Sequence, residues 1–149
     1  MTDSPSEAEV NETPEGEGQE GVGEESSGDN LAAFAAELAG VVGASNWSAE
    51  HGVARLAIDR DNWVAAAVAA RESGLPFFSW LSAVDWAQEV EVGEPADSPD
   101  DLEERFEVIC RLSSVRTADA VHLVATLPKD DPQLPSLVPE FGGAEWHER

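Results

Sequence analysis

Few side chains in this sequence have the type and spacing needed for catalysis. Cys110 is the single cysteine, and the three histidines, His51, His122 and His147, are too scattered for the paired spacing of a helical metal site. One cysteine cannot hold a four-thiolate iron–sulfur cluster. Cys110 also falls on the apolar side of an alternating segment, which is typical of a small core residue. We therefore expect this chain to bind no metal or cluster by itself.

Asp85 is the best candidate for a general base. It ends an apolar run and precedes Trp86, where a carboxylate can be partly desolvated. The sequence pairs no second catalytic group with it, so a turn-starting aspartate is the better interpretation. His122 lies on the polar side of its segment, which favours a surface or interface position over catalysis. We predict no self-contained active site, and an independent hydrolase using Asp85 is the weakest alternative.

Acidic residues dominate the charge and gather in two segments. The 149 residues include 31 acids and 8 bases, for a formal charge of −23. Residues 1–30 carry ten acids and no base, and residues 87–104 carry eight acids and no base. The first segment is rich in Glu, Gly and Ser and has almost no large apolar residue, which predicts a disordered acidic tail. The second segment contains Pro95 and Pro99 and predicts a long acidic loop.

This composition bounds the possible partners and the location. Strong negative charge repels phosphate backbones, so we expect no nucleic-acid binding. No stretch approaches 18 consecutive apolar residues, and the N-terminus has no basic and apolar regions of a signal peptide. We expect a soluble cytoplasmic chain without direct membrane insertion, so that any membrane attachment comes through partners.

Residues 31–149 have the patterns of one α+β domain. Helical spacing begins at Leu31, behind Asp29 and Asn30 as caps, and Gly43 ends the first helix. A weak strand at 46–48 and a strand at 53–59 precede an alanine-rich helix at 63–73, which residues 59–62 could cap. Segment 77–86 is apolar on both sides, which suits a central strand. Segments 105–112 and 121–127 alternate, and a short connection at 116–119 suggests a hairpin. The order αββαβββ predicts a two-layer sandwich, with a mixed sheet of about five strands and helices on one face.

Three consecutive parts of the last third carry a family resemblance. They read RFEVICRLSSV from Arg105, VHLVATLPKDDPQLPSL from Val121 and GGAEWHER up to Arg149, and they follow FFSWLSAVDW at 77–86. Together they resemble the 30-kDa subunit of bacterial NADH-quinone oxidoreductase, respiratory complex I. The resemblance covers residues 31–149. The family continues its Glu-Arg pair with a further Glu and an aromatic-Gly turn, whereas the sequence stops at the pair, so we expect an incomplete docking segment.

The resemblance implies a non-catalytic subunit of the peripheral arm of a proton-pumping complex. FMN, Fe–S clusters and quinone would be held by partner subunits, and the chain would lie at the cytoplasmic side of the cell membrane. It would contact the sister subunit that helps form the quinone site. The implied interface residues are Asp131, Pro132, Pro135 and Ser136 in an extended arm, and Trp146, Glu148 and Arg149 at the start of a docking helix.

The residues add detail and leave alternatives open. Pro132 and Pro135 stiffen the arm, and Ser136 is placed to cap a short helix through Phe141. Of the five tryptophans, we assign Trp80 to the core and Trp146 to an interface. The alternatives are a subunit of a related membrane-bound hydrogenase-type complex, a free-standing acidic adaptor, and a truncated paralogue.

Overall fold

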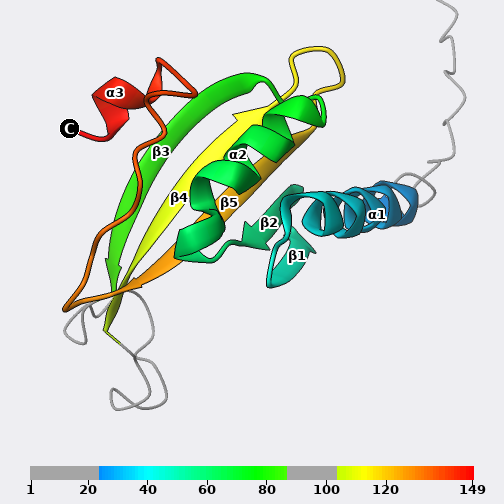
Figure 1. Cartoon of the computed structure of the whole chain (residues 1–149). Coiled ribbons are helices and arrows are strands. Elements are labelled where there is room, and N and C mark those ends of the chain that lie inside the picture. Colours follow the sequence, from blue (N-terminus) through cyan, green and yellow to red (C-terminus); the bar gives the residue numbers. More distant parts are fainter. Residues whose placement is uncertain (1–23, 87–103) are drawn as a thin grey trace, which may run out of the picture.

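The computed structural model describes residues 24–86 and 104–149 (Figure 1). Along the chain lie the helix α1 (Glu24–Val42), the strands β1 (Asn46–Glu50) and β2 (Val53–Ala57), and the short 3₁₀ helix η1 (Arg60–Asn62). The helix α2 (Trp63–Glu72) and the strands β3 (Phe77–Trp86), β4 (Arg105–Ser113) and β5 (Ala120–Pro128) follow, and α3 (Ala144–His147) is last. The predicted tail up to residue 23 and the predicted loop at 87–103 lie outside the described residues.

The five strands form one sheet in the order β1-β2-β5-β4-β3. Strands β2 and β5 are parallel, and the other neighbouring pairs are antiparallel. The predicted mixed sheet of an α+β fold is therefore confirmed. The predicted hairpin is also present, because the turn between β4 and β5 is closed by a hydrogen bond from the Ser114 amide to the Asp119 carbonyl at 2.9 Å.

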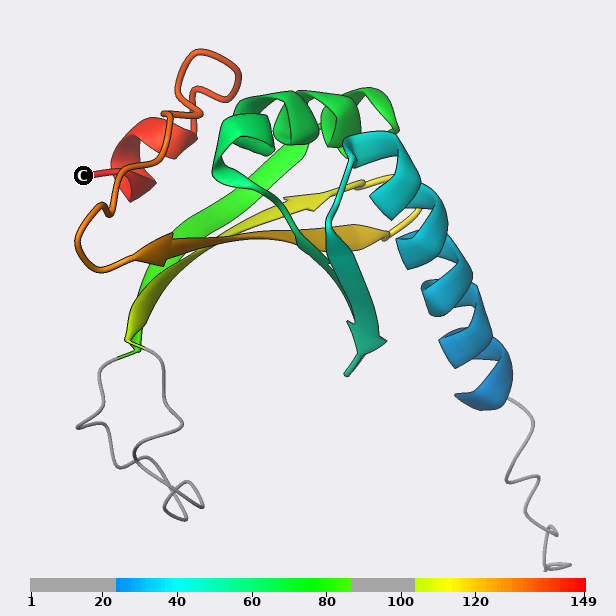
Figure 2. The ribbon, with the colours of Figure 1, turned by 60° about the horizontal axis from the view of Figure 1, so that its bottom comes forward.

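The two sides of the sheet have different neighbours. Helices α2 and α3 lie on one side, and α1 runs beside β1 and β2 (Figure 2). The side chains on the helix side of the three long strands, which we call the covered face, include Leu81, Cys110, Leu112, Leu123 and Leu127. The alternate side chains form what we call the open face, because the described residues place no helix against them on β3, β4 and β5.

The first helix begins earlier than its pattern predicts. Residues 24–30 already belong to α1, so Asp29 and Asn30 lie inside the helix and the predicted capping by them is wrong. Propagating an existing helix fixes one residue at a time, so poor helix formers can extend a helix that its buried part has nucleated. The predicted end is confirmed: Gly43 has a φ of +68°, and the Ala44 amide bonds the Ala39 carbonyl at 3.0 Å.

Asn62, one of the residues predicted to cap α2, has another role. No side-chain hydrogen bond caps the start of this helix. The Asn62 amide nitrogen instead donates to the Val42 carbonyl at 2.8 Å. It therefore satisfies an acceptor that the end of α1 leaves free, and it ties the two helices together.

Strand β3 corrects two predictions. It lies at one end of the strand order and is not a central strand. A register shift between Phe78 and Trp80 then turns Trp80 to the open face, opposite Arg111. Trp80 is half-buried there, with its ring edge against His122 at 5.3 Å between centroids, so its assignment to the core is wrong. Both sides of this strand are apolar in sequence, but only one of them is covered in the structure.

Candidate functional site: the C-terminal arm

The segment from Lys129 to Gly143, which we call the arm, follows β5 and leads to α3. Its start is held by Arg60 of η1. The Arg60 guanidinium donates to the Asp131 carboxylate at 2.6 Å and to the Asp131 carbonyl at 3.1 Å. Asp131 is thus a brace that fixes where the arm leaves the sheet. Pro132 and Pro135 follow it as exposed residues of an extended segment.

The middle of the arm is pinned to the core. Leu137 is fully buried and Phe141 nearly so, with the Phe141 ring 5.8 Å from the Phe78 ring. Arg71 of α2 donates to the Glu140 carbonyl at 3.0 Å and pairs with its carboxylate at 3.0 Å. These contacts join the arm to α2 and β3.

Glu148, just after α3, binds the middle of the arm. Its carboxylate accepts a hydrogen bond from the Ser136 hydroxyl at 2.6 Å and another from the Leu137 amide at 2.7 Å. The Val138 amide donates to the Ser136 oxygen at 3.1 Å. The predicted helix through Phe141 is not formed: residues 138–140 make a turn, closed by the Phe141 amide on the Leu137 carbonyl at 2.8 Å. With Pro135 fixing the chain just before it, one capped turn brings Phe141 into the core.

Helix α3 presents an aromatic side chain to solvent. Trp146 is 82% exposed, the largest exposed fraction among the big apolar side chains of the described residues. The Arg149 guanidinium lies 6.0 Å from the Trp146 ring centre and donates to the Glu145 carboxylate at 2.6 Å. Ala144 is buried, and His147 bonds the Leu81 carbonyl at 3.1 Å, so the opposite side of α3 is anchored.

A cavity of about 310 Å³ separates the arm from the sheet. Leu81, Val108 and Leu127 line it from the covered face, and Pro132 and Pro135 line it from the arm. Trp63 also lines it, and its indole nitrogen is the one buried side-chain nitrogen or oxygen in the described part of the chain without a hydrogen-bond partner. Ser136, His147 and Glu148 line it as well, so the cavity combines apolar and polar walls, and it has one buried donor to spare.

The structure thus brings the seven predicted interface residues into one region but divides their roles. Asp131, Ser136 and Glu148 form bonds within the chain, whereas Pro132, Pro135 and Trp146 are exposed, and Arg149 pairs beside Trp146. Sequence reasoning missed Arg60, Arg71 and Trp63. Nothing local in the sequence connects Arg60 and Arg71 to partners about 70 residues away.

The other chemical candidates are not arranged for catalysis. Burial raises the pKa of the Cys110 thiol to about 12, and the negative charge of Glu148 adds to this shift, so the thiol is protonated and inert. Asp85 pairs with Lys129 on the surface. His122 is on the open face, as predicted, and burial, Arg111 and Arg55 lower its pKa. In the described ranges no three His, Cys, Asp or Glu side chains are grouped to hold a metal ion.

Comparison with known proteins identifies the family of this chain. Residues 56–149 match the sequence model of a family described as the 30-kDa subunit of respiratory-chain NADH dehydrogenase. The chain belongs to this family. The match contains β3 to α3 and the whole arm, so the segments that carry the resemblance are those the family shares.

Solved structures of other proteins share the fold. A trypsin-resistant fragment (1–134) of Nqo5 is similar with a TM-score of 0.60 and 18% identity, over 80% of this chain and 87% of that one. A chain of the membrane-bound sulfane sulfur reductase, an archaeal respiratory membrane complex, has a TM-score of 0.63 and 16% identity. That match covers 79% of this chain and 63% of the other. None of the curated proteins matches this chain.

Proposed function

We propose that this 30-kDa-family chain is a non-catalytic subunit of the peripheral arm of a proton-pumping NADH-quinone oxidoreductase. It supports electron transfer from NADH to quinone, with FMN, Fe–S clusters and quinone bound by partner subunits. It contacts the sister subunit of the quinone site and lies at the cytoplasmic side of the membrane. No helix of the described residues is long and apolar enough to cross a membrane. Attachment through partners is consistent with that finding.

The observation that carries the proposal is the joint position of Trp146 and the cavity beneath the arm. An exposed tryptophan on an anchored helix is a typical centre of a protein interface. The cavity beneath the arm, which His147 and Glu148 help to line, offers room for a side chain of a partner. Both features lie inside the family match. Because Asp131 and Glu148 hold the arm in place, the surface is preorganised and little ordering is needed on binding.

Purification of the tagged chain tests this proposal. The chain is tagged at its N-terminus and expressed in its own host, and the membranes are solubilised gently. We expect sister subunits carrying flavin and clusters to co-purify with NADH-quinone reductase activity. Trp146→Ala should lower their recovery, and Val115→Ala is the matched control because Val115 is 79% exposed in the β4–β5 turn. Recovery of a folded monomer alone would contradict the proposal and favour an acidic adaptor or a truncated paralogue.

A second candidate is a subunit of a related membrane-bound hydrogenase-type complex. The similarity of the fold to a chain of an archaeal respiratory membrane complex favours it as the alternative. The same purification separates the two. Co-purifying subunits that reduce quinone with hydrogen or another donor, and not with NADH, would select this alternative.

A further inference from the structure

The cavity beneath the arm has one carboxylate in its wall. Glu148 is the single Asp, Glu, Lys or Arg among the residues that line it. Its carboxylate accepts hydrogen bonds from the Ser136 hydroxyl and the Leu137 amide, and both donors are neutral. In the part of the chain that the structure describes, no Lys, Arg or His lies within ion-pair distance of Glu148. The wall therefore has a negative charge that these residues leave without a counter-ion.

The arginines of the same region are already paired. Arg60 binds Asp131 at the start of the arm, and Arg149 binds Glu145 on α3, both at 2.6 Å. A carboxylate has about four lone-pair sites, so Glu148 can accept further hydrogen bonds besides the two that it has. A cation that pairs with it has to come from outside these residues.

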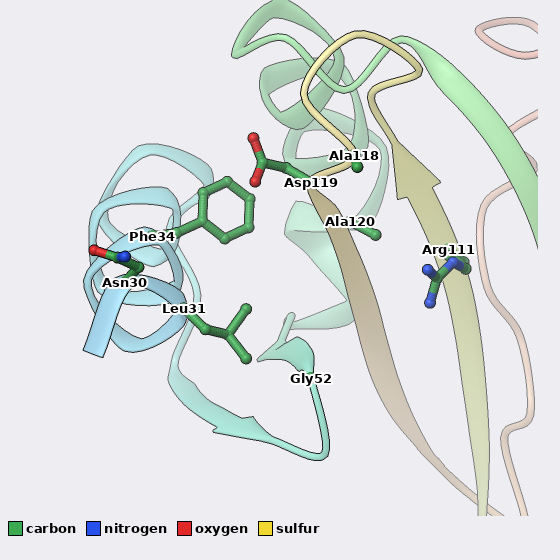
Figure 3. A pocket seen from close by; sticks show the side chains of 8 residues that line it. All are labelled: Asn30, Leu31, Phe34, Gly52, Arg111, Ala118, Asp119 and Ala120. Atoms are coloured by element: carbon green, nitrogen blue, oxygen red, sulfur yellow. The ribbon is translucent and has the colours of Figure 1, made fainter. Parts of the chain in front are cut away.

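Another cavity of similar volume differs in this respect. It measures about 300 Å³, and Leu31 and Phe34 line it from α1. Arg111 and Asp119 both line it, as Figure 3 shows. Its wall contains one charge of each sign, so it favours neither a cation nor an anion. The cavity beneath the arm, at about 310 Å³, has the acid without the base.

A side chain that fills the cavity beneath the arm displaces water from Glu148, and this selects the occupant. An apolar side chain would leave the carboxylate without water or a partner, which is unfavourable, and an acidic one would repel it. A neutral donor would bind it more weakly than a cation does. A lysine or arginine can place its apolar stem along Leu81, Val108 and Leu127 and its cation at the carboxylate. Trp63 does not affect the choice, because its side chain has no exposed surface.

We propose that the cavity beneath the arm binds a lysine or arginine side chain of the sister subunit, and that the Glu148 carboxylate pairs with its cation. This inference rests on the proposed function and specifies which group enters the cavity. Trp146 lies on α3 and Glu148 directly follows that helix, so the exposed ring and the ion pair belong to one interface.

Removing the charge while keeping the shape of the side chain tests the inference. The tagged full chain with Glu148→Gln is expressed in its own host, and the assembly is purified from gently solubilised membranes. We expect at least about tenfold less sister subunit at physiological salt than with the parent, because the cation in the cavity then lacks its partner. Glu72→Gln makes the same change on an exposed residue at the end of α2 and should change retention less than about twofold. Equal losses in the two variants would overturn the inference.

A second control separates the charge of Glu148 from the support that it gives to the arm. Ser136→Ala removes a hydroxyl that donates to Glu148 and keeps the carboxylate. It should lower retention less than about threefold, because one neutral donor is lost and the ion pair remains. If Ser136→Ala and Glu148→Gln lower retention equally, Glu148 acts only through the position of the arm, and the inference is overturned.

Site-specific cross-linking gives a measurement that does not depend on the stability of a Glu148 variant. The photoreactive residue p-benzoylphenylalanine replaces Pro132, an exposed residue of the cavity wall, in the full chain. The captured residue in the intact assembly is identified by mass spectrometry. We expect a lysine or arginine of another subunit, or a residue next to one. Capture of a segment without such a neighbour, capture of a second copy of this chain, or no capture would overturn the inference.

Trp146→Ala in the same purification keeps the outcomes distinct. If Trp146→Ala loses the sister subunit and Glu148→Gln retains it, this inference is overturned and the proposed function stands. If no other subunit co-purifies with the parent chain, both are overturned.

Discussion

The two faces of the sheet are built from alternate residues of the same strands, yet they differ in almost every property. In β4, Cys110 and Leu112 are fully buried on the covered face, whereas Arg111 between them faces the other way. In β5, Leu123 is fully buried and its neighbour His122 is only half-buried. The covered face holds the domain together, and the open face keeps charges and aromatic rings available. The side chains of the core and those of the uncovered side are therefore separated by one residue of register.

The largest expected effect comes from the covered face. Leu123→Ala should lower the free energy of unfolding by about 2–5 kcal/mol, because it removes buried methyl groups and leaves a cavity. Thr126→Ala, on the open side of the same strand, should change it by less than about 0.5 kcal/mol. Urea denaturation measures both. Similar costs for the two variants would show that the faces do not differ in this way.

This contrast shows what sequence patterns can and cannot predict. Alternation in 105–112 and 121–127 identifies β4 and β5 and the inward position of Cys110. In 77–86 both sides are apolar, so the pattern does not tell which side is covered, and it assigns Trp80 to the wrong one. The place of a strand in the sheet depends on pairings far along the chain, and no local period reports them.

The arm shows the same limit. Prolines predict its extended course, and composition predicts an interface at Trp146, which stays a prediction. The contact of Glu148 with the arm cannot be predicted from the sequence, because it requires the Ser136 hydroxyl and the Leu137 amide to donate to the same carboxylate. The resemblance locates the region, and only the structure divides it into bracing and exposed residues.

The bracing role of Glu148 predicts an effect of about 1 kcal/mol. Glu148→Gln replaces a charged acceptor of two hydrogen bonds by a neutral one, so the arm should open more often. Hydrogen exchange at the Leu137 amide measures this opening. Glu145→Gln is the control, because Glu145 contributes to an exposed pair with Arg149. Faster exchange in the control than in the Glu148 variant would contradict the assignment.

The open face should also make stability depend on pH. Burial, Arg111 and Arg55 lower the pKa of His122 below its ordinary value of 6.5, so the unfolded chain binds a proton that the folded chain resists. The folded state therefore loses stability as the pH falls below about 6.5, and it keeps full stability above that. A neutral His122 accepts a hydrogen bond from Arg111, at 3.1 Å, and has the Trp80 ring beside it.

Replacing His122 tests this dependence. His122→Gln keeps a neutral acceptor at every pH, so the free energy of unfolding should fall less steeply between pH 7.5 and 5.5 than in the parent. Glu148→Gln weakens two hydrogen bonds to a charged acceptor, whereas His122→Gln changes only one neutral acceptor, so the effect should be smaller than that of Glu148→Gln. His51→Gln, in the exposed β1–β2 turn, should leave the slope unchanged. A steeper slope in His122→Gln would show that the sign is wrong.

The smallest effect on the free energy of unfolding is expected in the turn that joins β4 to β5 and sets their register. Ala118 has a φ of +64°, a left-handed conformation that costs an L-residue roughly 1–2 kcal/mol. Ala118→Gly removes that strain, while the greater freedom of glycine in the unfolded chain costs roughly 0.5–1 kcal/mol. The net result should be a stabilisation of about 0.5 kcal/mol.

Ala120→Gly, at the start of β5, has no such strain to relieve and should destabilise the protein instead. Chemical denaturation of the pair should therefore give changes of opposite sign, and the same sign in both would mean that Ala118 is not strained.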